Sequence, residues 1–118
     1  MTIVDKLAGD DIGVLALNAG VFVMGPFLKL SDAEVEQHVQ VNVMHVAYLM
    51  KSMTDMVVQR QKNTGIKAGV MITSSGLGNY AFPGTAMYSA SKAFATFVAS
   101  ALNFELKEHV DVIAYLAG

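Results

Sequence analysis

The stretch GVMIT, residues 69–73, is the middle one of three short apolar runs in this sequence. IGVLAL (residues 12–17) precedes it, and VDVIAY (residues 110–115) follows it near the end of the chain. The first two runs are continuous rather than alternating, which is typical of parallel strands covered on both faces. We therefore predict three buried, adjacent, parallel strands.

Two long helical segments are predicted between these strands. The first begins at LSDAE, where Ser31 and Glu34 form a capping-box pattern, and extends to about residue 61. The second runs from about residue 85 to about residue 109. The order β-α-β-α-β predicts an α/β fold with a parallel sheet and right-handed crossovers. Three strands and two crossovers make one half of a doubly wound, Rossmann-like fold, so the sheet is expected to be partial.

Composition and charge limit the possible functions. The chain has 118 residues, enough for one domain at most, with 53% hydrophobic residues and a net charge of -2. No basic patch is visible, which argues against nucleic acid as a partner. The absence of cysteine excludes disulfides and a cysteine nucleophile. The three histidines lack the spacing of a zinc site, so no metal is expected.

Residues 68–91 carry no charge, but they contain Pro83, several glycines and many hydroxyl side chains. A spanning helix needs about 20 predominantly apolar residues, so we expect no membrane anchor in this chain. The sequence leaves the compartment open between the cytoplasm and, where a full-length protein carries an N-terminal anchor, the endoplasmic reticulum.

GTAMYSASKAF (residues 84–94) places Tyr88 and Lys92 on one face of the second helix. A lysine ammonium beside a phenol favours the phenolate, which lets a tyrosine exchange a proton near neutral pH. Ser75 comes just after GVMIT, at the strand end where open α/β sheets bind ligands, and its hydroxyl is suited to hold a substrate oxygen. Taken alone, the tyrosine and lysine also fit a surface aromatic with a lysine stem beside it.

Three motifs together resemble the short-chain dehydrogenase/reductase family. Ser75-x12-Tyr88-x3-Lys92 has the spacing of the family's catalytic signature, and ITSSGLGNYAFPGTAMYSASKAF is similar to that region throughout. LNAG (residues 17–20) resembles the family's Asn-Asn-Ala-Gly, and VNVMH puts Asn42 where the family carries its fourth catalytic residue. MITSSG and YSASKAF are most similar to the 17β-hydroxysteroid dehydrogenase and 3-oxoacyl-CoA reductase branch.

The resemblance implies a role for each residue. Tyr88 is the general acid and base toward a small-molecule carbonyl or alcohol, and Lys92 supports its phenolate and binds the nicotinamide ribose. Ser75, in preference to Ser74, orients the substrate oxygen, while Asn42 holds a water in a proton relay. The cofactor is NADP or NAD, with NADP preferred. The implied cofactor-binding residues are Asn18, Ala19, Gly20, Tyr88 and Lys92.

Plainer interpretations stay open for the weaker motifs. Asn42 by itself also fits a mid-helix polar residue that bonds a backbone carbonyl. Residues 18–20 also fit an ordinary exit from a strand, because asparagine and glycine are common in turns. The methionines of the first helix are expected to pack in the core or at an interface rather than to bind a ligand.

The chain departs from the family pattern mainly by what it lacks. Sixteen residues precede LNAG, no glycine-rich phosphate-binding turn occurs, and Leu17 replaces the first asparagine of the motif. Ala117 stands where the family usually has proline, and the substrate loop beyond it is missing. We therefore expect residues 1–118 to be a partial domain without the N-terminal cofactor-binding half and the C-terminal substrate loop.

The functional expectation is an NAD(P)-dependent oxidoreductase of steroid or fatty-acyl type that is inactive as this chain alone. The alternative is a non-catalytic module of the same ancestry that works by association. Both long helices carry apolar residues on more than one face, so one face is left for a partner. The resemblance implies a homo-oligomer built through these two helices.

Overall fold

The computed structural model describes residues 1–117 and contains one parallel three-stranded sheet. The strands β1 (Val14–Leu17), β2 (Ala68–Ser75) and β3 (Val110–Ala117) lie in the order β1-β2-β3. Both pairings are parallel, and Val70 of β2 lies between Leu15 and Val112. The predicted α/β class and strand directions are confirmed.

The strand boundaries differ from the predictions by one or two residues. β1 begins two residues later than predicted, and β3 continues through residue 117. β2 includes Ser75, which therefore ends the strand rather than following it. Asn18 directly follows β1, so both side chains lie at the carboxyl edge of the sheet, as predicted. Gly118, predicted at the same edge, lies outside the described residues.

The connection from β1 to β2 is helical in three consecutive parts. These are α2 (Asp32–Gln37), the π-helical segment η2 (His38–Met44) and α3 (His45–Thr64). The predicted capping box is present: Ser31 N donates to Glu34 Oε2 over 2.8 Å, and Glu34 N donates to Ser31 Oγ over 3.2 Å. The π-helical segment was not predicted, and it carries the candidate residue Asn42.

The second long helix, α4 (Ala86–Glu105), ends about four residues before its predicted end. Val110 N already donates to Leu106 O over 2.8 Å, and Asn103 Oδ1 accepts from Val112 N over 3.0 Å, so the chain turns at once into β3. The remaining elements are short. They are α1 (Ile3–Leu7), η1 (Phe27–Lys29) and η3 (Gly76–Asn79).

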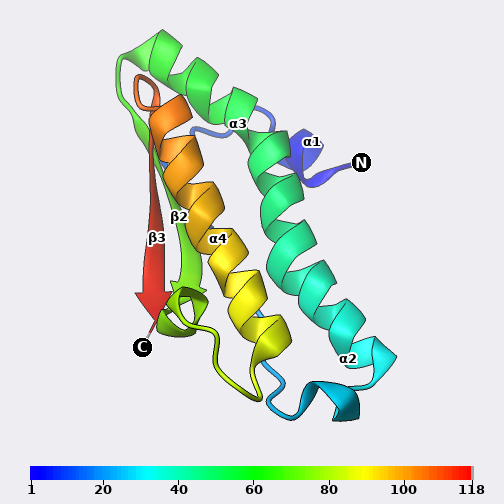
Figure 1. Cartoon of the computed structure of the whole chain (residues 1–118). Helices are drawn as coiled ribbons and strands as arrows, with labels where there is room; N and C mark the ends of the chain where they lie inside the picture. Colours follow the sequence, from blue (N-terminus) through cyan, green and yellow to red (C-terminus); the bar gives the residue numbers. More distant parts are fainter. Residues whose placement is uncertain (118) are drawn as a thin grey trace.

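The helices α3 and α4 run side by side, and both pack against the same face of the sheet (Figure 1). The core between them and the strands includes Ile72, Val112, Val57 and Ala99, each at most 3% exposed. On the opposite face of β3, Ile113 is 59% exposed. Among the helices of residues 1–117, none combines the length and apolar character that a membrane crossing requires.

Candidate active site

Lys92 is a buried cation near the start of α4, with only 5% of its surface exposed. Its Nζ donates to the backbone oxygen of Thr73 over 3.1 Å and lies 5.7 Å from the centre of the Tyr88 ring. Because burial removes water from the ammonium, it lowers the pKa of Lys92 from the ordinary value of 10.5. The structure therefore brings together the lysine and tyrosine that the sequence placed on one helix face.

Asn42 reaches the same region from η2 and is 2% exposed. Its Oδ1 accepts from Val21 N over 2.8 Å, and its Nδ2 donates to Val21 O over 2.8 Å and to Ser91 Oγ over 3.0 Å. Asn42 does bond a backbone carbonyl, but one of the loop after β1 rather than of its own helix. It thereby joins three segments: η2, this loop and α4.

Gly20 lies beside the side chains of Lys92 and Asn42, and these three residues form a corner of the site. A Cβ atom at this position would lie 3.2 Å from Lys92 Nζ and 3.4 Å from Asn42 Oδ1. The first distance is tighter than that of most real Cβ contacts, so a side chain here would require the lysine ammonium to move by a few tenths of an ångström. The sequence placed Gly20 in the cofactor cleft, and the structure adds its direct proximity to the lysine ammonium.

Thr73 contacts two of the candidate residues, although no role was predicted for it. Its backbone oxygen accepts from Lys92, and its Oγ1 donates to Asn18 Oδ1 over 2.8 Å. Asn18 and the following Ala19 are both exposed. A backbone carbonyl is present at every position, so no sequence signal could have identified this contact.

The two serines at the end of β2 have different partners. Ser74 Oγ donates to Lys92 O over 2.8 Å and lies 2.7 Å from Thr96 Oγ1, so it attaches β2 to α4. Ser75 Oγ accepts from Leu77 N over 3.2 Å, which leaves its own proton for a ligand. Within residues 1–117, no hydrogen bond joins the side chains of Ser75 and Tyr88.

Tyr88 is partly exposed and has a second aromatic ring against it. The ring centres of Phe22 and Tyr88 are 4.5 Å apart at an interplanar angle of 58°. Phe22 follows the LNAG motif by two residues and was not among the predicted site residues. Its apolar character alone could not have distinguished it from a core residue.

The full sequence, residues 1–118, matches the profile of the short chain dehydrogenase family. The chain belongs to this family. A very-long-chain 3-oxoacyl-CoA reductase from Danio rerio is 31% identical over 86% of this chain and 32% of the relative. Human 17-beta-hydroxysteroid dehydrogenase type 3 is 32% identical over 95% of this chain and 35% of the relative. The chain thus lies near the predicted branch and spans about a third of these relatives' length.

Solved structures of the family show the same fold. A bulky-bulky ketone specific alcohol dehydrogenase from Comamonas testosteroni superposes with a TM-score of 0.83 and 27% identity, covering 96% of this chain and 45% of the other. A 4-hydroxyisoleucine dehydrogenase and a 3-ketoacyl-(acyl-carrier-protein) reductase from Brucella melitensis, 24% and 22% identical, were each solved with NADH. These two proteins, which share the fold, therefore bind NADH.

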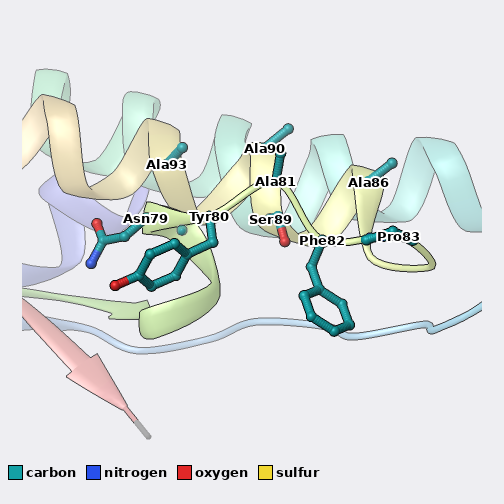
Figure 2. Close-up of a pocket in the computed structure, with 10 residues that line it drawn as sticks. Asn79, Tyr80, Ala81, Phe82, Pro83, Ala86, Ser89, Ala90 and Ala93 are labelled. Atoms are coloured by element: carbon teal, nitrogen blue, oxygen red, sulfur yellow. The ribbon is translucent and has the colours of Figure 1, made fainter.

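A cavity of about 580 Å³ lies beside α4. It is lined by the 79–83 loop and by Ala86, Ser89, Ala90 and Ala93, and Figure 2 shows Tyr80 and Phe82 extending from the loop. Its walls include neither Tyr88 nor Lys92, so it is separate from the corner formed by Lys92, Asn42 and Gly20. No group of acidic residues and histidines within residues 1–117 is arranged to hold a metal ion.

Proposed function

We propose that this chain is the catalytic part of an NAD(P)-dependent oxidoreductase that interconverts a carbonyl and a secondary alcohol. The observation that carries the proposal is the buried Lys92 ammonium, which lies 5.7 Å from the centre of the Tyr88 ring. Gly20 lies next to both this ammonium and the Asn42 side chain. Burying a lysine away from a carboxylate is unfavourable, which points to a role in a site rather than in stability.

The corner fits the ribose of a nicotinamide cofactor, and we propose NADP in preference to NAD. Lys92 uses one of its three N–H donors on Thr73 O, which leaves donors for ribose hydroxyls. The missing Cβ at Gly20 lets a ligand approach the backbone there, and Asn18 and Ala19 are exposed beside it. When bound, this cofactor supplies or accepts the hydride.

The chain's own residues handle the proton. Tyr88 gives its hydroxyl proton to the substrate oxygen in reduction and takes it back in oxidation, while the Lys92 charge stabilises the phenolate between these steps. Ser75, whose proton is free, donates to the same oxygen and fixes its position. Asn42 uses both side-chain N–H donors on Val21 and Ser91, so we propose that it holds its relay water through an acceptor atom.

We propose a steroid or a fatty-acyl carbonyl as the substrate class, because similar proteins are named as a 17-beta-hydroxysteroid dehydrogenase and a very-long-chain 3-oxoacyl-CoA reductase. We propose that the 118 residues by themselves neither bind NADH or NADPH tightly nor turn over substrate. Much dinucleotide affinity comes from pyrophosphate contacts at a glycine-rich turn, and the sequence contains no such turn.

Large exposed side chains favour association as a second property. Phe97 and Phe104 on α4 are 76% and 78% exposed, and Tyr48 on α3 is 63% exposed. We propose a homo-oligomer formed through these two helices. The alternative function is a non-catalytic module that acts only by association. Light scattering tests whether the chain forms an oligomer, but it does not distinguish this module from a catalytic oligomer.

Two measurements test the proposal. Calorimetric titration of the folded chain with NADH and NADPH is expected to show no micromolar binding. Turnover of a carbonyl panel is then measured on the chain supplied with the cofactor-binding half of a relative. Tyr88→Phe is expected to lower that turnover by about 10² to 10⁴-fold, whereas the control Tyr80→Phe, at a 71% exposed residue, changes little. Turnover that survives Tyr88→Phe would contradict the catalytic assignment.

A further inference from the structure

His38 is a fully buried polar residue that the proposed mechanism does not use; its exposed fraction is 0%. Its Nδ1 lies 2.7 Å from Glu34 O, and its Nε2 lies 3.2 Å from Val23 N. A carbonyl oxygen can only accept, so Nδ1 carries the proton, and a backbone N–H can only donate, so Nε2 is bare. The two partners therefore define a neutral imidazole protonated at Nδ1.

His38 and Asn42 hold the same short segment of the loop after β1. They are four residues apart in η2 and so lie on neighbouring turns. Asn42 bonds both the N–H and the C=O of Val21, and His38 accepts from the N–H of Val23, two residues further on. The two side chains thus bond alternate residues of the loop, as an adjacent strand would.

Phe22, between the two held residues, connects this segment to Tyr88. Val21 and Val23 are partly buried while Phe22 is 47% exposed, which is the alternation expected of an extended segment held along one edge. The ring of Phe22 lies 4.5 Å from the ring of Tyr88, centre to centre. Holding the backbone on both sides of Phe22 therefore limits the positions that its ring can take against Tyr88.

We propose that His38 is a positioning residue: as a neutral imidazole it anchors Val23 and, through Phe22, sets the position of the Tyr88 ring. The importance of that position rests on the proposed catalytic role of Tyr88, but the chain of contacts does not. Any buried histidine needs partners for both ring nitrogens, and here one of them is the N–H of the loop residue next to Phe22. The seven-residue π-helical segment supplies the local geometry for this arrangement, and such segments are frequent at functional sites.

The test compares His38→Leu, His38→Gln and the control His109→Leu in the full chain, without cofactor or substrate. His109 Nδ1 bonds Gln61 Oε1 over 2.7 Å at the distant end of α3, so its replacement removes a histidine hydrogen bond elsewhere. Amide exchange is measured at Val23 by NMR, together with the ring resonances of Tyr88, assigned with Tyr88→Phe. His38→Leu is expected to speed exchange at Val23 about tenfold and to shift the Tyr88 ring resonances.

His38→Gln restores an acceptor and is expected to return part of the protection at Val23, while His109→Leu leaves both readouts unchanged. Unchanged Val23 exchange or unchanged Tyr88 resonances in folded His38→Leu would overturn the proposal. If His38→Leu does not fold, the ¹⁵N spectrum of the unmodified chain is used instead, because it shows which ring nitrogen of His38 carries the proton. A bare Nε2 and a protonated Nδ1 support the proposal, and the opposite tautomer contradicts it. None of these readouts depends on turnover, so their failure is distinct from failure of the proposed activity.

Discussion

The two halves of α4 are buried to the same depth but carry opposite chemistry. In the first half, Ser89, Ser91 and Lys92 are 4–6% exposed, and all three are polar. In the second half, residues 95–105, Ala95 and Ala99 are each 1% exposed and belong to the apolar core. A single helix therefore serves as one wall of the candidate site and as one layer of the core.

The difference shows how the chain separates stability from chemistry. Apolar burial stabilises the fold by roughly 25 cal/mol per Å², and the second half of α4 supplies such burial. Polar groups gain little net free energy from burial even when they are paired, and they are expensive to leave unpaired. The partners Thr73 O, Asn42 and Thr85 offset that penalty for Lys92, Ser91 and Ser89 in turn.

The largest loss of stability is expected from Ile72→Ala, which truncates a fully buried side chain in the apolar layer. Leaving a cavity there should lower the free energy of unfolding by about 2–5 kcal/mol. Urea unfolding followed by circular dichroism measures this. The control is Ile113→Ala on the uncovered face, where the residue is 59% exposed and a change of about 0.5 kcal/mol or less is expected. Equal losses would mean that the two faces are equally covered in solution.

Gly78→Ala tests the polar half of α4. The substitution adds a Cβ atom to η3 that pushes against the α4 backbone. A Cβ at this position would lie 2.8 Å from the carbonyl carbon of Lys92 and 3.0 Å from Ala93 N. Neither backbone atom can move without shifting α4, so we expect a loss of about 1–3 kcal/mol. Gly76→Ala is the matched control, because nothing lies within 4 Å of its added Cβ. Equal stability of the two variants would show that η3 does not pack closely on α4.

A smaller loss is expected from Ser74→Ala, which removes the side chain that attaches β2 to α4. Thr96 Oγ1 also donates to Lys92 O, over 3.1 Å, so that carbonyl keeps a partner. We therefore expect a loss of about 1 kcal/mol, the usual net value of one hydrogen bond. The exposed Ser52 on α3 provides the control, and Ser52→Ala should leave the urea midpoint unchanged. A loss above that of Gly78→Ala would show that this attachment, not the close packing, holds the polar half.

Local signals in the sequence predicted most of the fold. The apolar runs gave the three strands, and Ser31 with Glu34 gave the start of α2. The end of α4 was misplaced because Asn103 accepts from Val112 N, a contact between segments that no local pattern records. The π-helical segment was missed because the partners of His38 and Asn42 lie in the loop after β1.

The site was predictable only in part, for a similar reason. Tyr88, Lys92 and Ser75 have side chains and spacings that point to chemistry. The Thr73 carbonyl and the space beside Gly20 are properties of the backbone in three dimensions. Their contribution becomes visible only when the strand ends and α4 are brought together.

The smallest net change in the free energy of unfolding at neutral pH is expected from Lys92→Met. This substitution makes the polar half of α4 more like the apolar half. The substitution removes the hydrogen bond from the charged ammonium to Thr73 O, a loss of about 1.5–3 kcal/mol. It also removes an ammonium whose burial is unfavourable, and this gain opposes the loss. Folding should therefore survive Lys92→Met even though the proposed turnover should not.

The pH dependence separates these two contributions. Burial lowers the pKa of Lys92 in the folded chain, whereas the unfolded chain keeps the ordinary value of 10.5. Between the lowered value and 10.5, the unfolded chain binds more protons, so the stability of the unmodified chain rises with pH relative to Lys92→Met. Below that window the penalty for the buried charge is fully present. Urea unfolding of both proteins from neutral pH to about 10.5 measures the difference, and the variant subtracts the titration of all other groups. A difference that stays constant or falls with rising pH would mean that the Lys92 ammonium is hydrated or paired in solution, and the two halves of α4 would then not share the same depth of burial.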